Sequence, residues 1–390
     1  MELSYLNKKF CELYGSGDLR TFFSPSRVNL IGEHIDYNGG YVLPCAIELG
    51  TYGCVRKRRD NHIRLASENF SLKVEVDIDD LKYENKHDWA NYPKGVFSCM
   101  KEEGYRVSGM DILIWGNIPN GAGLSSSASL ELLIAEIINS LFNEGAIPKI
   151  DLIKISQKAE NDFVGVKCGI MDQFAVAMGK ANNAMLLDCN SLKFKYINMN
   201  IKDYKLVIMN TNKRRELNSS KYNERRNECE KALSILRNYK NIDNLCQLTA
   251  KEYEEIEKHI VEEHIKNRAH HVIYENQRVL KACEALENGD MIELGQLFIE
   301  SHNSLRDLYE VTGIELDTIV EAALKQEGCI GARMTGAGFG GCGIALVEEK
   351  SVEEFIDKVG SLYERKIGHK ANFYLTGIGD GTREIIGAWH

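Results

Sequence analysis

Hydrophobic and polar residues follow different patterns in the two halves of the chain. Apolar-rich segments typical of β-strands occur in the first half, at residues 42–55, 62–66, 70–76 and 110–115. Two segments there have helical periodicity, at residues 125–142 and 151–163. The second half is mostly helical before it returns to a mixed pattern, with helical residues 221–305, strand-like residues 342–347, helical residues 352–363 and strand-like residues 372–376. This mixture of strands and helices in both halves predicts an α+β fold.

The length of the chain bears on the number of domains. With 390 residues, of which 44% are hydrophobic, the chain can fill two cores. Neither a repeat nor a low-complexity linker marks a boundary between them. We therefore place the division near residue 200, with one domain at residues 1–200 and the other at 201–390.

The charge and the cysteines narrow the classes of partner and the compartment. A net charge of −9 argues against a nucleic-acid-binding or membrane-binding surface, and we interpret the basic run RKRR at residues 56–59 as a solvated hairpin turn. Eleven cysteines without a C-x-x-C pair indicate reduced thiols rather than disulfides or a zinc site. We find no signal-like apolar segment at the start and no apolar window of membrane-spanning length. We therefore expect a cytoplasmic protein.

The sequence GNIPNGAGLSSSAS at residues 116–129 has two glycines with the spacing of a phosphate-binding P-loop, but Ala122 stands where a P-loop has lysine. It follows a predicted strand and precedes a predicted helix. Backbone N–H groups and the positive end of the helix dipole would therefore point at the loop and form an anion site. A serine hydroxyl in the first turn could bind Mg²⁺. The alternative is an ordinary helix start in which a serine is the N-cap.

A second glycine-rich stretch, GAGFGG at residues 336–341, satisfies the dinucleotide-binding pattern G-x-G-x-x-G. The segment that follows it is strand-like rather than helical, and residues 331–335 do not have the pattern of a buried strand. We therefore interpret it as a glycine-rich turn that enters a strand.

A third stretch, SPSRVNLIGEHIDYNGG at residues 24–40, carries many polar side chains around Gly32. Such density suggests a sugar-like or metal ligand. Binding of a transition metal by His34 is not supported, because the sequence has no second His or Cys group with the spacing of metal ligands. A third interpretation is a polar loop with an internal salt bridge between Arg27 and Glu33.

Together the three stretches resemble the three signature motifs of the GHMP small-molecule kinases, and residues 26–37 resemble the galactokinase pattern G-R-x-N-L-I-G-E-H-x-D-Y, with Ser26 in place of its first glycine. Two further segments are similar to galactokinase sequences, CGIMDQ at residues 168–173 and SKYNERR at 220–226. The similarity extends in the same order over roughly residues 20 to 380. It implies a ribosomal-S5-like N-terminal domain, a ferredoxin-like C-terminal domain and an active site in the cleft between them.

The resemblance also implies an activity, the transfer of the γ-phosphoryl group of ATP to the C1 hydroxyl of α-D-galactose. Asp172 and Arg27 would be the catalytic residues. The sugar would be bound by Glu33, His34, Asp36, Gly169, Asp172 and Tyr222. The nucleotide phosphates would lie on Gly121, Ala122, Gly123, Leu124, Ser125, Ser126, Ser127 and Ala128, with Mg²⁺ held by Ser127 and Glu160. By itself, Glu160 is typical of a surface carboxylate on a helix.

Two rival functions remain open at this level. An N-acetylgalactosamine kinase has much the same motifs, and the space around C2 of the sugar would distinguish it. A non-catalytic sugar and nucleotide sensor could dispense with Asp172, Arg27 or the serines, all of which are present here. The oligomeric state is not readable from the chain, although a monomer is favoured.

Overall fold

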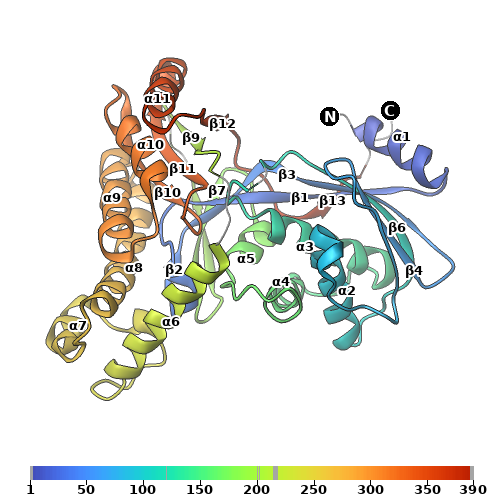
Figure 1. Ribbon diagram of the computed structural model, residues 1–390, viewed down its shortest axis with the longest axis horizontal. Helices are drawn as coiled ribbons and strands as arrows, with labels where there is room; N and C mark the ends of the chain where they lie inside the picture. Colours follow the sequence, from blue (N-terminus) through green and yellow to red (C-terminus); the bar gives the residue numbers. More distant parts are fainter. Residues whose placement is uncertain (1–2, 120, 200, 202, 214–217, 387–390) are drawn as a thin grey trace.

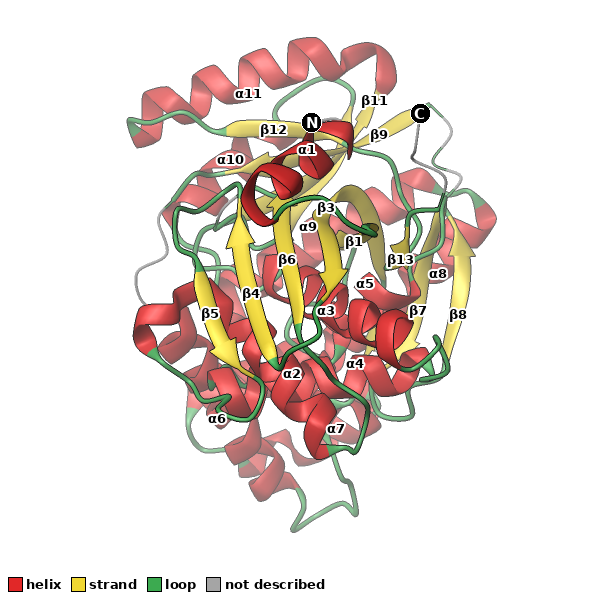
Figure 2. Cartoon of the chain, turned by 90° about the vertical axis from the view of Figure 1, so that its right-hand side faces the viewer, coloured by secondary structure: helices red, strands yellow, loops and turns green. Residues whose placement is uncertain are grey.

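A six-stranded sheet with the order β13-β1-β3-β6-β4-β5 organises the first half of the chain (Figures 1 and 2). Its strands are β1 (Arg20–Asn29), β3 (Pro44–Lys57), β4 (His62–Ser67), β5 (Val74–Asp77), β6 (Met110–Gly116) and β13 (Arg383–Glu384). β13 comes from the other end of the chain and pairs with Phe22 and Phe23 of β1. The computed structural model describes residues 3–386 apart from 120, 200, 202 and 214–217.

Helices cover both faces of this sheet because successive strand residues point to opposite sides. Cys54 and Leu113 pack with Phe10 of the first helix, whereas their neighbours Val55 and Ile112 face the main core. Figure 2 shows the first helix lying across the front of the sheet. The helices of this half are α1 (Leu3–Tyr14), α2 (Asn91–Glu102), α3 (Ser126–Phe142), α4 (Lys149–Lys158) and α5 (Met171–Met178).

The second half contains a four-stranded antiparallel sheet with the order β10-β11-β9-β12. Its strands are β9 (Tyr204–Asn210), β10 (Cys329–Thr335), β11 (Cys342–Glu348) and β12 (Asn372–Leu375). Val207 and Ala345 pack with Phe355 on the side of α10 and α11, and their neighbours Ile208 and Ile344 join the main core. The helices are α6 (Asn218–Leu236), α7 (Ala250–Ile256), α8 (Glu263–Asn288), α9 (Met291–Ser304), α10 (Ile314–Leu324) and α11 (Val352–Ile367).

A small three-stranded sheet, with the order β2-β7-β8, completes the architecture. It consists of β2 (Tyr41–Val42), β7 (Asn183–Asp188) and β8 (Phe194–Asn198). The predicted mixture of strands and helices is confirmed. The division at residue 200 stays a prediction, and residue 200 itself lies outside the described residues. Within the part of the chain that the structure describes, no helix is both long and apolar enough to span a membrane.

The prediction that the basic run at residues 56–59 forms the turn of a hairpin is wrong. The strands on either side of it, β3 and β4, are not neighbours, because β6 lies between them. Arg56 and Arg58 instead pair with the buried carboxylate of Asp111 on β6, at 2.6 and 3.0 Å, and Arg64 pairs with it at 2.6 Å. A buried carboxylate needs such partners. These arginines therefore hold three strands together.

Residues 331–335 form a buried strand, contrary to our prediction. They lie in β10, where Arg333 has no exposed surface. Its charge is tolerated because the carboxylates of Glu33 and Glu275 lie beside it. The following residues 336–341 connect β10 to the antiparallel β11, so the prediction of a glycine-rich turn entering a strand is confirmed.

Candidate active site

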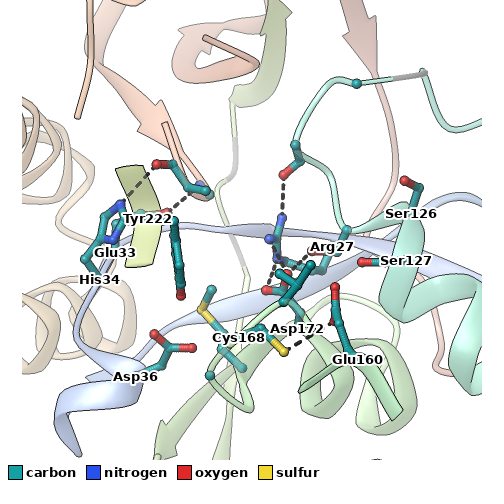
Figure 3. Close-up of a pocket in the computed structure, with 18 of the residues that line it drawn as sticks. Arg27, Glu33, His34, Asp36, Ser126, Ser127, Glu160, Cys168, Asp172 and Tyr222 are labelled. Carbon is teal, nitrogen blue, oxygen red and sulfur yellow. Dashed lines mark hydrogen bonds and ion pairs between the residues drawn. The ribbon is translucent and has the colours of Figure 1, made fainter. Parts of the chain in front are cut away.

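A cavity of about 350 Å³ gathers residues from both halves of the chain (Figure 3). Its volume lies in the usual range for small-molecule sites. The residues of the predicted site that line it are Arg27, Glu33, His34, Asp36, Gly121, Gly123, Ser125, Ser126, Ser127, Glu160, Gly169, Asp172 and Tyr222. Ala122, Leu124 and Ala128 are buried in the core, so a ligand could meet only their backbone.

Arg27 on β1 and Asp172 in the first turn of α5 form a bidentate ion pair. Nε and Nη2 of Arg27 each donate to a different oxygen of Asp172, both at 2.7 Å. Nη1 donates to the carbonyl of Gly123 at 3.0 Å. Because the carboxylate keeps 27% of its side chain exposed while Arg27 keeps 4%, the guanidinium fixes a carboxylate that still faces the cavity.

The loop before α3 has the backbone of an anion site. Gly121 and Gly123 have φ values of 68° and 77°, which favour glycine. Ser125 is also left-handed and does not cap the helix, since its hydroxyl donates to Asp172 instead. The first N–H groups of α3 therefore remain available to an anion. Ser26, the residue that departs from the galactokinase pattern, donates its hydroxyl to the carbonyl of Leu124 and ties this loop to β1.

Glu160 and Ser127 lie together at the loop side of the cavity (Figure 3). Glu160 is on a π-helical turn, Ala159–Val164, that continues α4, and it is 6% exposed rather than a surface carboxylate. Burial, followed by the charge of Asp172, raises the pKa of Glu160 to about 7, and the hydroxyl of Ser127 opposes that rise. Among the described residues, no group of three or more His, Cys, Asp or Glu side chains is arranged to hold a metal ion.

Glu33 is buried against the second half of the chain. It pairs with Arg333, and its Oε1 accepts a hydrogen bond from the backbone N–H of Gly336 at 3.1 Å. The alternative of a salt bridge between Arg27 and Glu33 is wrong, because Arg27 is paired with Asp172. Burial raises the pKa of Glu33 above its usual value, and the charge of Arg333 opposes that rise.

His34 is held between the two halves of the chain as a neutral side chain. Burial is the largest of the effects that lower its pKa to about 3. Nε2 lies 3.1 Å from the carbonyl of Ala337 and must carry the proton, because a carbonyl only accepts. Nδ1 then accepts from the hydroxyl of Tyr37 at 2.9 Å. Both ring nitrogens are thus engaged before any ligand binds.

Asp36, Gly169 and Tyr222 line the same side of the cavity. A Cβ atom at Gly169 would overlap a carboxylate oxygen of Asp36, so this position has room only for glycine. Burial, followed by the charge of Asp172, raises the pKa of Asp36 to about 6. Tyr222, on α6, places its ring 5.5 Å from the ring of His34, and burial raises its pKa well above the usual value.

A second cavity, of about 180 Å³, adjoins the first at Ser126 and Ser127 and was not predicted. Phe70, Trp89 and Ile118 are among the apolar residues that line it. The rings of Phe70 and Trp89 are stacked with their centroids 6.5 Å apart. Phe70 and Ile118 lie in the segments after β4 and β6, and Trp89 lies in a short helical turn before α2, so no short motif could have revealed their proximity.

Glu131 and Gln173 were also missed. Both are fully buried behind the cavity, and Nε2 of Gln173 donates to Glu131 at 3.0 Å and to Glu160 at 2.7 Å. Gln173 directly follows Asp172 in the sequence, and this adjacency is a local hint of its place. Burial, followed by the charge of Glu160, raises the pKa of Glu131 well above its usual value.

Comparison with family models defines the class. GHMP kinase models match residues 91–180 (N-terminal domain) and residues 282–365 (C-terminal domain), and a galactokinase galactose-binding signature matches residues 8–57. A mevalonate kinase from Methanococcus jannaschii, 20% identical over 94% of this chain and 100% of its own, has a TM-score of 0.66 and supports the fold alone. The architecture is that of a two-domain GHMP kinase.

Individual relatives narrow the family. A galactokinase from Clostridium tetani is 60% identical over 99% of this chain and 98% of its own length, and one from Clostridium beijerinckii is 52% identical over 98% and 99%. The crystal structure of a Lactococcus lactis galactokinase complexed with galactose has a TM-score of 0.96, with 46% identity over 98% of this chain and 100% of that chain. The chain belongs to the galactokinase family.

Proposed function

We propose that this chain transfers the γ-phosphoryl group of ATP to the C1 hydroxyl of α-D-galactose, giving galactose 1-phosphate and ADP. The observation that carries this proposal is the ion pair of Asp172 and Arg27. It lies between the phosphate loop on one side and the polar cluster that begins at Glu33 on the other. A carboxylate held in this position faces both substrates of a phosphoryl transfer.

The sugar would be oriented by the polar groups opposite the loop. We assign Glu33 and His34 to the primary hydroxyl, Asp36 to the 3- and 4-hydroxyls and Tyr222 to the side of the 4-hydroxyl, with the backbone of Gly169 completing the wall. The ring nitrogens of His34 already have partners, so a hydroxyl would share or displace one of them. An epimer would leave one of these buried groups unpaired, which costs about 1–3 kcal/mol.

The nucleotide would lie along the other side. Its phosphates would rest on the backbone of residues 121–128 and the N-terminus of α3. This arrangement explains how a phosphate loop can function without a lysine. The adjoining cavity, with Phe70 and Trp89, would take the base, because stacked aromatic walls suit a flat ring.

Mg²⁺ fits the side chains at the junction of the two substrates. Ser127 and Glu160 offer a hydroxyl and a carboxylate, and Mg²⁺ prefers such hard oxygen ligands together with substrate phosphates. Bound there, Mg²⁺ would neutralise negative charge on the phosphate oxygens. Few protein ligands are required, since Mg²⁺ keeps several of its waters and binds phosphate oxygens.

In the transfer, the C1 oxygen forms a bond to the γ-phosphorus while the bond to the bridging oxygen of ADP breaks. Asp172 orients the C1 hydroxyl and accepts its proton late, because a loose transition state demands little activation of the nucleophile. Arg27 is a fixed cation beside the transferred group and stabilises the charge that develops there. The two hydrogen bonds from its guanidinium group keep the carboxylate of Asp172 in one orientation during the transfer.

The surroundings of the enzyme are also proposed. None of the eleven cysteines forms a disulfide in the structure, which supports a reducing, cytoplasmic location. We propose galactose and ATP with Mg²⁺ as the ligands, and neither nucleic acid nor a membrane as a partner. A monomer stays a prediction.

A coupled assay of ADP release tests the function. We expect turnover to require galactose and Mg²⁺, with glucose far poorer and N-acetylgalactosamine included to test the space at C2. Asp172→Asn keeps the shape but removes the proton acceptor, so turnover should fall by roughly 10²-fold or more while galactose binding measured by calorimetry survives. Equal turnover of glucose and galactose, or near-normal turnover of Asp172→Asn, would refute the proposal.

A further inference from the structure

We propose that Glu131 is a positioning residue for Glu160 and acts through Gln173. The proposal rests on the function given above, in which Glu160 binds the metal ion. Glu131 lies on α3, is fully buried and does not line the cavity. It reaches the site through the amide nitrogen of Gln173, which lies 3.0 Å from Glu131 and 2.7 Å from Glu160.

The geometry fixes which end of the Gln173 amide faces Glu160. An amide nitrogen carries two hydrogens, and here each is directed at a different carboxylate. Oε1 of Gln173 has no hydrogen-bond partner among the described residues, so the nitrogen alone aligns the amide. Without the acceptor on Glu131, the amide could turn its oxygen toward Glu160, and two oxygens would then oppose each other.

The orientation of Gln173 in turn selects the free oxygen of Glu160. Gln173 donates to Oε2 of Glu160, and Sγ of Cys168 donates to the same oxygen at 3.3 Å (Figure 3). Oε1 is therefore left to face Ser127 and a metal ion. Partners of this kind, one step behind a metal ligand, commonly set its orientation and affinity.

Stability does not account for a carboxyl group at position 131. Oε1 of Glu131 has no partner in the part of the chain that the structure describes, and the side chain has no exposed surface. Burying a polar group with half of its hydrogen bonds unmade costs free energy, and an apolar side chain of the same volume would avoid that cost. The function that the contacts support is to provide an acceptor for Gln173.

Substitutions at both positions test this inference through metal binding rather than turnover. We would titrate Mn²⁺ by electron paramagnetic resonance into enzyme holding galactose and a non-hydrolysable ATP analogue. Glu131→Met, which removes the acceptor, should weaken Mn²⁺ binding about tenfold or more. Gln173→Met should weaken it similarly, and the double variant should be no worse than Gln173→Met because the two residues act in series. Glu131→Gln keeps an acceptor oxygen and should bind Mn²⁺ nearly as the wild type does.

Controls distinguish positioning of Glu160 from a loss of folding or of charge. Galactose affinity measured by calorimetry should stay unchanged in each variant, and Glu131→Leu replaces Glu131→Met if the latter does not fold. Additive losses in the double variant would overturn the positioning role. A loss in Glu131→Gln equal to that in Glu131→Met would also overturn it, because it would point to the charge of Glu131 rather than to the orientation of Gln173. If the wild type itself failed to bind Mn²⁺ with the nucleotide analogue, the proposed function would be at fault instead.

Discussion

In the proposed function Asp36 binds the sugar, and at this residue stability and function would oppose each other. Burial, followed by the charge of Asp172, raises its pKa from 3.8 to about 6. Above about pH 6 the folded protein therefore keeps a charge that the unfolded chain would hold more easily, and below about pH 4 both states are protonated. We expect Asp36→Asn to stabilise the protein at alkaline pH while it weakens galactose binding.

The size of the effect follows from the shift in pKa. The difference between 3.8 and about 6 is about 2.2 units, and at 1.36 kcal/mol per unit it sets an upper limit of about 3 kcal/mol. Partial exposure of the side chain reduces this figure. The substitution also loses part of the bonding to the backbone N–H groups of Tyr37 and Met171. We therefore expect a gain of ~1–3 kcal/mol at about pH 8 that shrinks toward zero near pH 4.

Urea denaturation at about pH 5 and about pH 8 measures the gain, and calorimetry at the higher pH measures galactose affinity. Asp18→Asn is the matched control because it removes the same charge from an exposed position. Galactose binding should weaken by about 1–3 kcal/mol in Asp36→Asn and stay unchanged in the control. A stability gain of equal size at both pH values, or no gain at about pH 8, would show that the charge of Asp36 is not the source of the cost.

Two further predictions concern the proposed catalytic pair and the second cavity. Arg27→Lys keeps the charge but loses the fork that binds both oxygens of Asp172, so its turnover should fall less than that of Arg27→Ala, for which we expect roughly 10²–10³-fold. Steady-state kinetics with galactose affinity measured alongside tests this order, and equal losses in both variants would contradict a role for charge. Trp89→Ala should raise the KM for ATP roughly tenfold and leave the KM for galactose unchanged, because it opens the wall of the base cavity. A shift of both KM values by the same factor would show that Trp89 does not contribute specifically to binding of the ATP base.

Residues of the candidate site could be located from the sequence where they belong to short contiguous motifs. Arg27 and Asp172 are 145 residues apart, but each belongs to a recognisable segment, and the structure brings the two side chains together. The glycines of the phosphate loop were also predictable, because their positive φ values are a local requirement. The alternative of an ordinary serine cap is wrong, because the hydroxyl of Ser125 bonds to Asp172 and makes no capping hydrogen bond to α3.

Pairings across the chain were beyond a sequence pattern. A strand that contains Arg333 does not look buried until Glu33, 300 residues away, is placed against it. In the same way, Arg56 and Arg58 have the sequence pattern of a solvated turn. Their burial partner, Asp111, lies on β6, which is inserted between β3 and β4. A charged residue is read as exposed unless its partner is known, so each of these errors has the same physical cause.

The contacts of the site divide the work between the two halves of the chain. Arg27 and Ser125 each bond to Asp172, and all three belong to the first half, so the groups that we propose as catalytic are aligned within it. The segment that contains Leu30 and Glu33, by contrast, is held by the second half of the chain. Nη1 of Arg333 donates to the carbonyl of Leu30 at 2.8 Å.

Glu275 adds to this support by accepting the backbone N–H of Gly32 at 3.1 Å. Burial alone would raise the pKa of Glu275, but Arg278, His271 and Arg333 lower it to about 2 and keep the carboxylate charged. Gly32 has no room for a side chain there, since a Cβ atom would meet the carbonyl of Tyr41 at 2.9 Å. A displacement of the second half would therefore move Glu33 relative to Asp172 while the ion pair of Asp172 with Arg27 stayed intact. In the roles that we propose, such a displacement would alter sugar binding without disturbing the catalytic pair.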